Sequence, residues 1–394
     1  YDNWGGYNLL VKLNQRNPDV QNYICDVIRY WVSEFDVDGI RLDAADVLDF
    51  DFMRMLRRTA EEVKPDFWLM GEVIHGDYSR WVNGETLHSV TNYALHKALY
   101  SGHNDHNYFE IAHTVKYLQN MGNLDLYNFV DNHDVERIYT KLSNKAHFTP
   151  VHILLYTLPG IPSIYYGSEF GIEGRKERSS DDSLRPVLSL DDYETALGDN
   201  PCTALVAALG QIRQHTPALS YGSYAELHLT NRQFAFARDL NDVRVVVTVN
   251  NDDNAASMDL PSGNATEYIG ALSGQKAAVQ DGHINVTVPA NSGEIWVPDG
   301  DMPEYKPFKI EISVKEETVT DEESIPADSE EPSAAAEPVH FDPNKSPEDM
   351  SVAELHAAIL TKMANNGPVT DQMQKTVNEN IWHDSLVNWL KSFR

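Results

Sequence analysis

The alternation of helical and strand patterns over residues 17–166 restricts the fold more than any other feature of this sequence. Asn17-Pro18-Asp19 predicts a helix start, with a capping side chain, a proline in the first turn and an acid near the positive end of the helix dipole. Apolar residues follow at helical spacing. Strand patterns then recur, separated by further helical patterns, at residues 37–43, 67–72, 125–130 and 163–166. This alternation predicts an α/β fold built from βαβ units on a parallel sheet.

Beyond residue 200 the pattern changes. Residues 201–215 are predicted to form a last helix, and residues 221–298 carry short period-2 runs between Asn, Asp and Gly turns, which predict an all-β sandwich. Residues 299–347 are rich in acids and proline, and we expect a disordered acidic linker there. Helical periodicity returns over residues 348–394 and predicts a small helical tail of undecided role.

The acidic balance of the chain excludes several classes of partner. A formal net charge of −29 opposes binding to phosphate backbones and to anionic membrane surfaces, so we expect neither a nucleic acid nor a membrane as partner. A neutral sugar is compatible with this charge, whereas the oligomeric state stays open. No apolar run approaches the roughly 20 residues that span a bilayer. Cys25 and Cys202 are expected to be free thiols, and we expect a cytoplasmic protein.

A charged pair stands at the end of the strand predicted over residues 37–43. Period-2 geometry places Arg41 and Asp43 on one face and Ile40 and Leu42 on the other. The apolar residues would face covering helices, and the charged pair would face inward at the carboxyl end, where parallel barrels perform their chemistry. The alternative is a buried ion pair that only stabilises the fold.

Glu72 ends the next predicted strand, one strand–helix–strand unit after Asp43. Carboxylates on neighbouring strands emerge at the same rim, and a separation of roughly 5–5.5 Å suits the nucleophile and the acid/base of a retaining glycosidase. Arg41 favours the attacking anion of Asp43. Glu72 has no cationic neighbour in the sequence, so we expect it to keep its proton and act as the acid. The alternative is a glutamate that only lies in solvent at the rim.

Asn132, His133 and Asp134 follow the third strand of this kind. A carboxylate beside an imidazole suits hydrogen bonding to sugar hydroxyls and stabilisation of an oxocarbenium-like charge. A metal site is the competing interpretation, because His and Asp are plausible ligands, but no second cluster in the sequence supports it. We therefore predict no cofactor and no metal ligands, with a calcium requirement left open.

These segments resemble the α-amylase superfamily, glycoside hydrolase family 13. Residues 39–43 are similar to its strand-4 motif, residues 71–75 to its strand-5 motif and residues 129–134 to its strand-7 motif. Residues 11–14 resemble the motif that closes domain B, in the neopullulanase and cyclomaltodextrinase branch, and residues 160–169 resemble the strand-8 motif. The resemblance spans residues 1–298. It implies that residues 1–16 end domain B and that residues 17–220 belong to a (β/α)8 TIM barrel.

Matched residue by residue, the resemblance implies a retaining hydrolase of α-1,4 glucosidic bonds in maltodextrins, with α-1,6 bonds as a further candidate. Asp43 would be the nucleophile, Glu72 the acid/base and Asp134 the stabiliser of the transition state. The expected substrate-binding residues are Arg41, Asn132, His133, His75 and Arg137. For Arg137 a rim contact and a structural salt bridge are equally compatible with the sequence. Further candidates for stacking on sugar rings are Trp4, Tyr7, Tyr78, Trp81 and Tyr166.

Two departures from the family pattern stand out. Residues 44–47 read Ala-Ala-Asp-Val, where many members carry a Lys-His or Asn-Glu pair near the reducing-end subsites. The strand-3 motif would lie upstream of Tyr1, so we expect a barrel without strands 1–3, and little or no turnover from these residues by themselves. A glucanotransferase or branching enzyme of the same superfamily, and a non-catalytic glucan-binding scaffold, are the alternatives.

Overall fold

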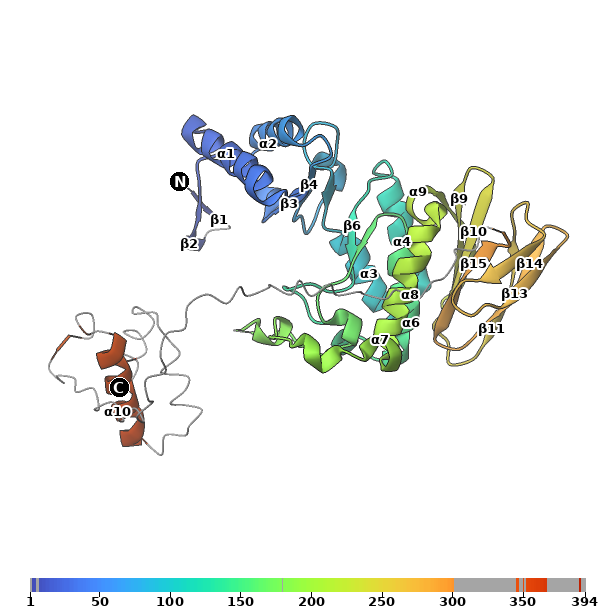
Figure 1. The fold of residues 1–394 in the computed structure, drawn as a ribbon. Helices are drawn as coiled ribbons and strands as arrows, with labels where there is room; N and C mark the ends of the chain where they lie inside the picture. The colour runs from blue at the N-terminus through green and yellow to red at the C-terminus, as the bar shows by residue number, and fades with distance from the viewer. Residues whose placement is uncertain are drawn as a thin grey trace, which may run out of the picture. The chain divides into compact units, whose positions relative to one another are not determined.

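The structure is a computed structural model that describes residues 2–4, 7–178, 180–300, 345, 346, 350, 352–366 and 390 (Figure 1). The chain divides into two compact units, Tyr1–Lys309 and Ile310–Arg394. In the second unit, helix α10 (Val352–Asn366) buries Leu355 and Ile359. The rest of the helical tail predicted over residues 348–394, and most of the acidic linker predicted over residues 299–347, lie outside the described residues.

The first unit opens with a hairpin and a long helix. Strands β1 (Asp2–Trp4) and β2 (Tyr7–Lys12) pair antiparallel. Helix α1 (Pro18–Phe35) begins at the predicted cap, where the Asn17 side chain accepts a hydrogen bond of 2.9 Å from the Asp19 amide. Cys25 and Ile28 form its buried face and belong to the same core as helix α2 (Phe50–Val63).

Short parallel strands form the sheet that carries the predicted carboxylates. Strands β3, β4 and β5 pair in that order, β6 pairs with β7, and a parallel bridge between Thr91 and Tyr127 joins the two groups. Sequence neighbours are therefore spatial neighbours, as the βαβ pattern predicts (Figure 1). The strands are β3 (Gly39–Leu42), β4 (Trp68–Gly71), β5 (Ser89–Val90), β6 (Tyr127–Phe129) and β7 (Ile161–Ser163).

The prediction of a last strand over residues 163–166 is wrong in its bounds, because the observed strand β7 covers Ile161–Ser163. Strand β7 ends at Ser163 because its partner β6 ends at Phe129, which lies opposite Ser163 in the ladder. The aromatic residues beyond Ser163 therefore belong to a loop at the carboxyl edge of the sheet.

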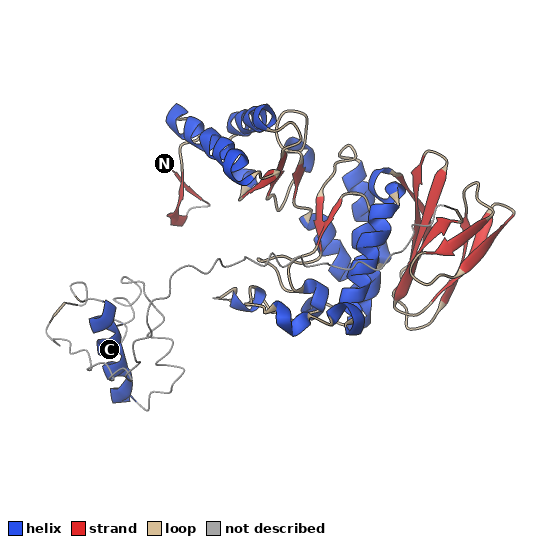
Figure 2. Cartoon of the chain, in the orientation of Figure 1, coloured by secondary structure: helices blue, strands red, loops and turns tan. Residues whose placement is uncertain are grey.

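Seven helices in the described part of the first unit follow α2. They are α3 (Tyr93–Asn104), α4 (Tyr108–Gln119), α5 (Ile138–Lys141), α6 (Phe148–Thr157), α7 (Ala196–Asp199), α8 (Pro201–His215) and α9 (Pro217–Tyr221). Helix α6 is buried on nearly all sides, because it contacts both α8 and the C-terminal sheet (Figure 2). Among the helices that the structure describes, none is long and apolar enough to cross a bilayer.

The C-terminal region is one antiparallel sheet of eight strands, in the order β11-β14-β13-β12-β15-β10-β9-β8. The strands predicted to form a sandwich are thus hydrogen-bonded into one continuous sheet. Side chains from strands β9 to β15 form a hydrophobic core of their own. The strands are β8 (Ser223–Leu229), β9 (Gln233–Leu240), β10 (Val243–Asn250), β11 (Ala256–Pro261), β12 (Glu267–Gly270), β13 (Lys276–Gln280), β14 (His283–Val288) and β15 (Ser292–Pro298).

Strand β10 is buried on both faces, and its side chains alternate between two cores. Val245, Val247 and Val249 belong to the core that includes the α3, α4 and α6 helices, whereas Val246 belongs to the core inside the sheet. The period of two in a strand produces this division. It explains why residues 243–249 carry a nearly continuous apolar run.

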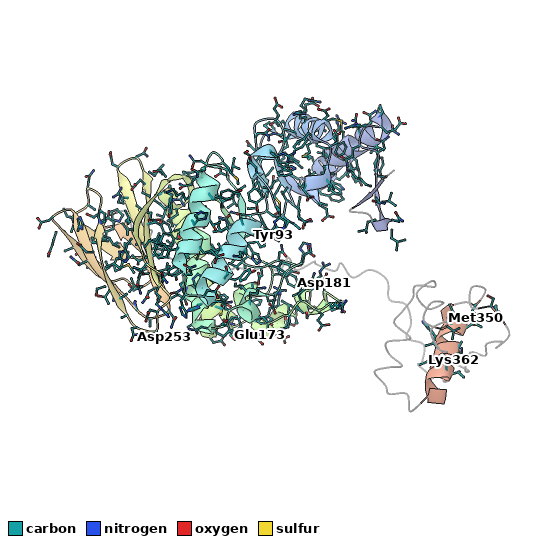
Figure 3. All side chains as sticks on the ribbon, turned by 180° about the vertical axis from the view of Figure 1, so that it is seen from behind. Tyr93, Glu173, Asp181, Asp253, Met350 and Lys362 are labelled. Atoms are coloured by element: carbon teal, nitrogen blue, oxygen red, sulfur yellow. The ribbon has the colours of Figure 1, made fainter. Side chains whose placement is uncertain are left out.

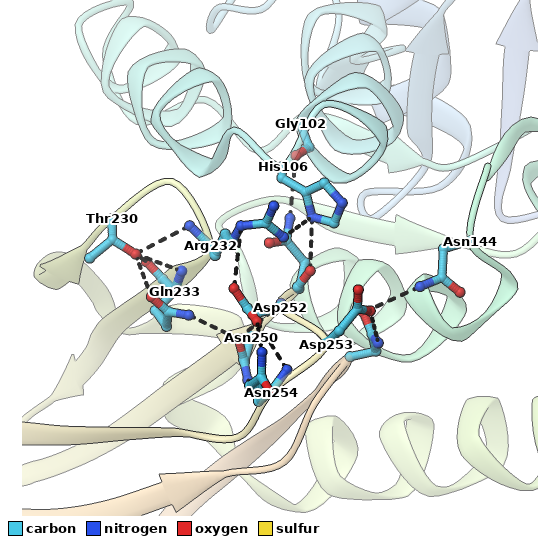
Figure 4. A network of polar contacts seen from close by, with 12 residues as sticks. Gly102, His106, Asn144, Thr230, Arg232, Gln233, Asn250, Asp252, Asp253 and Asn254 are labelled. Carbon is cyan, nitrogen blue, oxygen red and sulfur yellow. Dashed lines mark hydrogen bonds and ion pairs between the residues drawn. The ribbon is translucent and has the colours of Figure 1, made fainter.

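Polar contacts also fix the sheet to the helices. Buried Arg238 of β9 donates to the Thr157 carbonyl at the end of α6, at 2.6 Å, where the negative end of the helix dipole favours a cation. A second connection is drawn in Figure 4, where Arg232 pairs with Asp252 at 3.3 Å and contacts the ring of His106 in the loop between α3 and α4. The sheet and the helices of the first unit therefore share both apolar and polar contacts.

Candidate active site

Asp43 and Glu72 stand at adjacent positions on the carboxyl edge of the sheet. The register pairs Leu42 of β3 with Gly71 of β4, and the two acids come directly after these residues. Gly71 allows the close approach, because a Cβ atom there would lie 2.7 Å from the Cβ of Ala45. The Gly-Glu dipeptide thus places Glu72 beside Asp43 without a side chain between the strands.

One arginine joins the two carboxylates. Arg41 donates from Nη1 to Asp43 Oδ1 at 2.9 Å and lies with Nη2 3.0 Å from Glu72 Oε2. Such a fork holds the two acids close to one another through a single guanidinium. Glu72 has no cationic neighbour in the sequence, but it has one in space, because Arg41 also reaches it from the adjacent strand.

The two carboxylates differ in their exposure to solvent. The Asp43 side chain is 83% exposed, whereas that of Glu72 is 13% exposed. Glu72 Oε2 also accepts the Ala44 amide at 3.1 Å. Ala44 adopts a left-handed conformation, with φ 43°, which is costly for a residue with a Cβ and directs its amide to Glu72. The less exposed carboxylate, Glu72, is therefore held by Arg41 and by the Ala44 amide, whereas the exposed Asp43 is held, among the described residues, by Arg41 alone.

The loop after β6 holds Asp134 through an internal turn. Asn132 Oδ1 accepts the backbone amides of Asp134 at 2.8 Å and Val135 at 3.1 Å. His133 Nε2 lies 3.1 Å from Asp134 Oδ2. The predicted neighbours Asn132, His133 and Asp134 thus form one unit, in which Asn132 shapes the backbone and leaves its Oδ1 no role on a ligand.

Arg185 is a member of this cluster that the sequence did not single out. Its Nη2 lies 3.0 Å from Asp134 Oδ1, and its Nε donates to the His133 carbonyl at 3.2 Å. Asp181 shares the same Nη2 at 3.5 Å. Each predicted catalytic carboxylate therefore has an arginine partner, Arg41 for Asp43 and Glu72 and Arg185 for Asp134.

Tyr93 interacts with charged or polar groups of both clusters, and the sequence did not single it out either. It is the first residue of α3, the helix that follows β5, and is labelled in Figure 3; its hydroxyl accepts a hydrogen bond from Asn132 Nδ2 at 3.1 Å. Burial raises the pKa of Tyr93 above 10, and the carboxylates of Glu72 and Asp134 raise it further, against the Asn132 bond and the charge of Arg41. The pKa of this one hydroxyl is thus influenced by charged groups at the ends of three strands.

Of the two roles that the sequence left open for Arg137, the structure does not support the rim contact, because the residue lies in the interior. The side chain is fully buried and donates to the backbone carbonyls of Tyr166 and Leu184 and to Ser168 Oγ. Its guanidinium also lies 4.1 Å from the centre of the Tyr165 ring. Arg137 therefore fastens the loops that follow β6 and β7, a role that its place three residues after Asp134 did not reveal.

Asp131 is a buried carboxylate beneath the Asn132–Asp134 turn. It accepts the Ile138 amide at 2.7 Å and the Ser168 hydroxyl at 2.8 Å. Burial raises the pKa of Asp131 to about 6, against these two hydrogen bonds and the nearby charge of Arg137. Asp131 therefore belongs to the support of the site.

The other candidates differ in their exposure to solvent. His75 is exposed and makes no side-chain hydrogen bond within the described residues. Tyr78 and Trp81 are buried core residues, whereas Tyr166 is exposed; the side chains of Trp4 and Tyr7 lie outside the described residues. A pocket of about 570 Å³ lies at the amino ends of β6 and β7, and none of the predicted site residues lines it. The described residues hold no group of three metal-ligating side chains.

Parallel strands with covering helices, and carboxylates on arginines at the carboxyl edge, are typical of an α/β protein that performs chemistry at its strand ends. The family model of the alpha-amylase catalytic domain matches residues 4–200, which is half of the chain. The chain belongs to this family.

The chain is 31% identical to a cyclomaltodextrinase of Thermoanaerobacter pseudethanolicus over 249 residues, 61% of this chain and 42% of that protein. It is 28% identical to neopullulanase 2 of Thermoactinomyces vulgaris over 297 residues, 73% of this chain and 49% of that protein. A solved α-amylase from Anoxybacillus matches with a TM-score of 0.66 at 24% identity, over 75% of this chain and 66% of that chain. The fold is therefore the α-amylase barrel with a C-terminal antiparallel sheet. The chain spans about half the length of the curated relatives it matches.

Sequence reasoning missed Tyr93 and Arg185 for different reasons. Strand β5 has two residues, too few for a period-2 pattern, so nothing indicated that Tyr93 follows a strand end. Arg185 lies in a loop of 3-10 turns, 51 residues after Asp134, where no local pattern gives its contacts. The Asn92-Tyr93 pair at a helix start is the one signal that could have drawn attention to Tyr93.

Proposed function

We propose that this chain carries the active site of a retaining glycoside hydrolase that cleaves α-1,4 glucosidic bonds in maltodextrins, with α-1,6 bonds as a further candidate. The observation that supports this most is the Arg41 fork on Asp43 and Glu72, two carboxylates from adjacent strand ends with unequal exposure. Adjacent strand ends suit the short carboxylate separation, roughly 5–5.5 Å, of retaining enzymes. A structural ion pair alone would not need a second carboxylate on the same arginine.

The proposed roles follow from these contacts. Asp43, the exposed anion, attacks the anomeric carbon and forms the glycosyl ester, while Glu72 donates its proton to the departing glycosidic oxygen. Glu72 then takes a proton from the water that cleaves the ester, which restores both groups. When Glu72 carries the proton it attracts Arg41 less, so the charge of Arg41 then serves Asp43 alone.

Asp134 and His133 are proposed to bind sugar hydroxyls and to stabilise the positive charge that develops at the anomeric carbon. Asp134 can do so only if it shares Arg185 with the sugar, because Oδ1 and Oδ2 already contact Arg185 and His133. His75 is proposed as a further sugar contact because it is exposed in the loop after Glu72. Arg137 is not retained in this group.

The substrate class is proposed from the relatives, whose names are cyclomaltodextrinase and neopullulanase. We propose an α-glucan oligosaccharide as the partner and the cytoplasm as the location, since both cysteines are free thiols, which suits a reducing compartment. We also propose that strands 1–3 of the barrel are not among these 394 residues, and that residues 1–394 alone turn over substrate slowly or not at all. The exposure of Asp43 supports the second part, because electrostatic stabilisation of a transition state needs a site that excludes water.

The test uses the protein made from its complete reading frame, with the 394-residue chain assayed beside it. Maltoheptaose is incubated with wild type and Glu72→Gln, and reducing ends and chain lengths are measured over time. New reducing ends that disappear in Glu72→Gln support the hydrolase, whereas redistribution of chain lengths without new ends supports a glucanotransferase. Sugar binding without any turnover would favour a non-catalytic scaffold. Rapid turnover by the 394 residues alone would overturn the proposal on the isolated chain and leave the hydrolase intact.

A further inference from the structure

We propose that Tyr93 is a positioning residue that orients Asp134 through Asn132. This inference rests on the proposed function for its catalytic consequence, but its structural part stands on the contacts alone. The contacts form a chain of two steps: the Tyr93 hydroxyl accepts from Asn132 Nδ2 at 3.1 Å, and Asn132 Oδ1 accepts from the Asp134 amide at 2.8 Å.

The first step joins two strand ends that the sheet connects weakly. Thr91, the residue that follows β5, forms one isolated bridge with Tyr127 of β6, and no ladder joins the two strands. Tyr93 follows this bridge on one side and Asn132 follows β6 on the other, so their hydrogen bond closes the same junction at the carboxyl edge. A bond in this place limits how far the loop after β6 moves relative to its neighbour.

The ring of Tyr93 is itself held in place. It packs edge-on against Phe129 with ring centres 4.9 Å apart, and Phe129 is buried at the end of β6. His96, one turn further along α3, stacks on the ring of Phe129 with ring centres 4.9 Å apart. A hydroxyl on a clamped ring is a fixed acceptor, which suits a residue that sets the position of another side chain.

The second step is the turn that contains Asp134. With Oδ1 on two backbone amides and Nδ2 on Tyr93, the Asn132 amide group has its orientation defined from both ends. Removal of the Tyr93 hydroxyl frees the Nδ2 end and lets the amide rotate, which weakens the bonds to the Asp134 and Val135 amides. Substitution with phenylalanine keeps the ring and therefore its packing on Phe129.

Tyr108 supplies a matched control. It is also the first residue of a helix, α4, after an asparagine, and its hydroxyl has a side-chain partner, His103 Nε2 at 3.3 Å. It is fully buried and contacts no member of the site. Tyr108→Phe therefore removes a comparable hydroxyl in the same chain without touching the Asn132 turn.

The first experiment needs no turnover and uses the 394-residue chain. Amide hydrogen exchange at Asp134 and Val135 should become roughly three- to tenfold faster in Tyr93→Phe, as expected for the loss of one neutral hydrogen bond. Tyr108→Phe should leave these two amides unchanged. Equal exchange in wild type and Tyr93→Phe, or equal acceleration in both variants, would overturn the proposal.

The second experiment measures turnover of maltoheptaose by the protein from the complete reading frame. Tyr93→Phe should lower kcat roughly tenfold with little change in KM, since Asp134 is proposed to act mainly in the transition state. The double variant Tyr93→Phe/Asn132→Ala should be no slower than Asn132→Ala alone, because both changes break one chain of contacts. Additive losses would contradict a role through Asn132. If Glu72→Gln leaves turnover unchanged, the proposed function fails, and the exchange experiment alone then decides on Tyr93.

Discussion

Asp131 makes the stability of the site depend on pH in a direction opposite to that of most carboxylates. The side chain is 1% exposed, and its two oxygens are occupied by the Ser168 hydroxyl and the Ile138 amide. Burial raises its pKa from 3.8 to about 6. A carboxyl group with a raised folded-state pKa binds its proton more tightly in the folded chain, so it stabilises the fold fully below pH 3.8 and loses this contribution as the pH rises through 6.

The size of the effect follows from the two pKa values. A displacement of about two units corresponds to roughly 3 kcal/mol of unfolding free energy, of which roughly 2 kcal/mol is lost between pH 4.5 and 7.5. Asp131→Asn removes the titrating group and keeps an oxygen that can accept the Ile138 amide. The free energy of unfolding of wild type minus that of Asp131→Asn should therefore fall by roughly 2 kcal/mol over this range.

Urea unfolding of both proteins, followed by tryptophan fluorescence at pH steps from 4.5 to 7.5, measures this difference. Subtracting the unfolding free energy of Asp131→Asn from that of wild type cancels the contributions of all other titrating groups. Ser168→Ala supplies an internal control, because the Ser168 hydrogen bond lowers the Asp131 pKa, and its loss should make the pH dependence steeper. A difference between wild type and Asp131→Asn that stays constant, or that grows with pH, would refute the reasoning.

Two further predictions concern buried groups around the site and the sheet. Arg137→Met should cost roughly 3 kcal/mol of unfolding free energy, because the carbonyls of Tyr166 and Leu184 lose a donor, whereas the exposed Arg29→Met should cost less than about 0.5 kcal/mol; equal losses in the two variants would contradict the bracing role. Burial lowers the pKa of His103 from 6.5 to about 3, so its contribution is complete above pH 6.5 and is lost as the pH falls. Wild type should therefore lose roughly 2 kcal/mol more than His103→Gln between pH 7.5 and 5, measured by urea unfolding; parallel losses in both proteins would show that His103 does not titrate in this way.

Local sequence patterns predicted the elements well where a local cause decides them. The Asn17 cap with Pro18 and the Asn200 cap with Pro201 place the starts of α1 and α8, because a cap and a fixed proline φ depend on neighbouring residues only. The end of β7 could not be predicted in this way, since its partner strand determines it. The same holds for the C-terminal sheet, whose strands were expected but whose continuous order depends on long-range pairing.

The same distinction between local and long-range causes decides how much of the candidate site could be predicted. Asp43 and Glu72 could be placed at one rim because a parallel sheet aligns its carboxyl ends. Contacts between segments far apart in the chain could not be predicted from the sequence, among them the contact of Arg41 with Glu72 and that of Arg185 with Asp134. Arg137 shows the converse error, because proximity in sequence to Asp134 suggested a site residue and three-dimensional packing turned its side chain into the core.

The most direct test of the proposed mechanism is to trap the covalent intermediate. The protein from the complete reading frame is incubated with a fluorinated glucosyl fluoride that forms the glycosyl ester but hydrolyses slowly, and the modified peptide is sequenced by mass spectrometry. The account predicts one glucosyl group per chain, attached to the Asp43 carboxylate, and no label in Asp43→Asn. A label on Glu72 or Asp134, or turnover of the substrate that persists in Asp43→Asn, would contradict it.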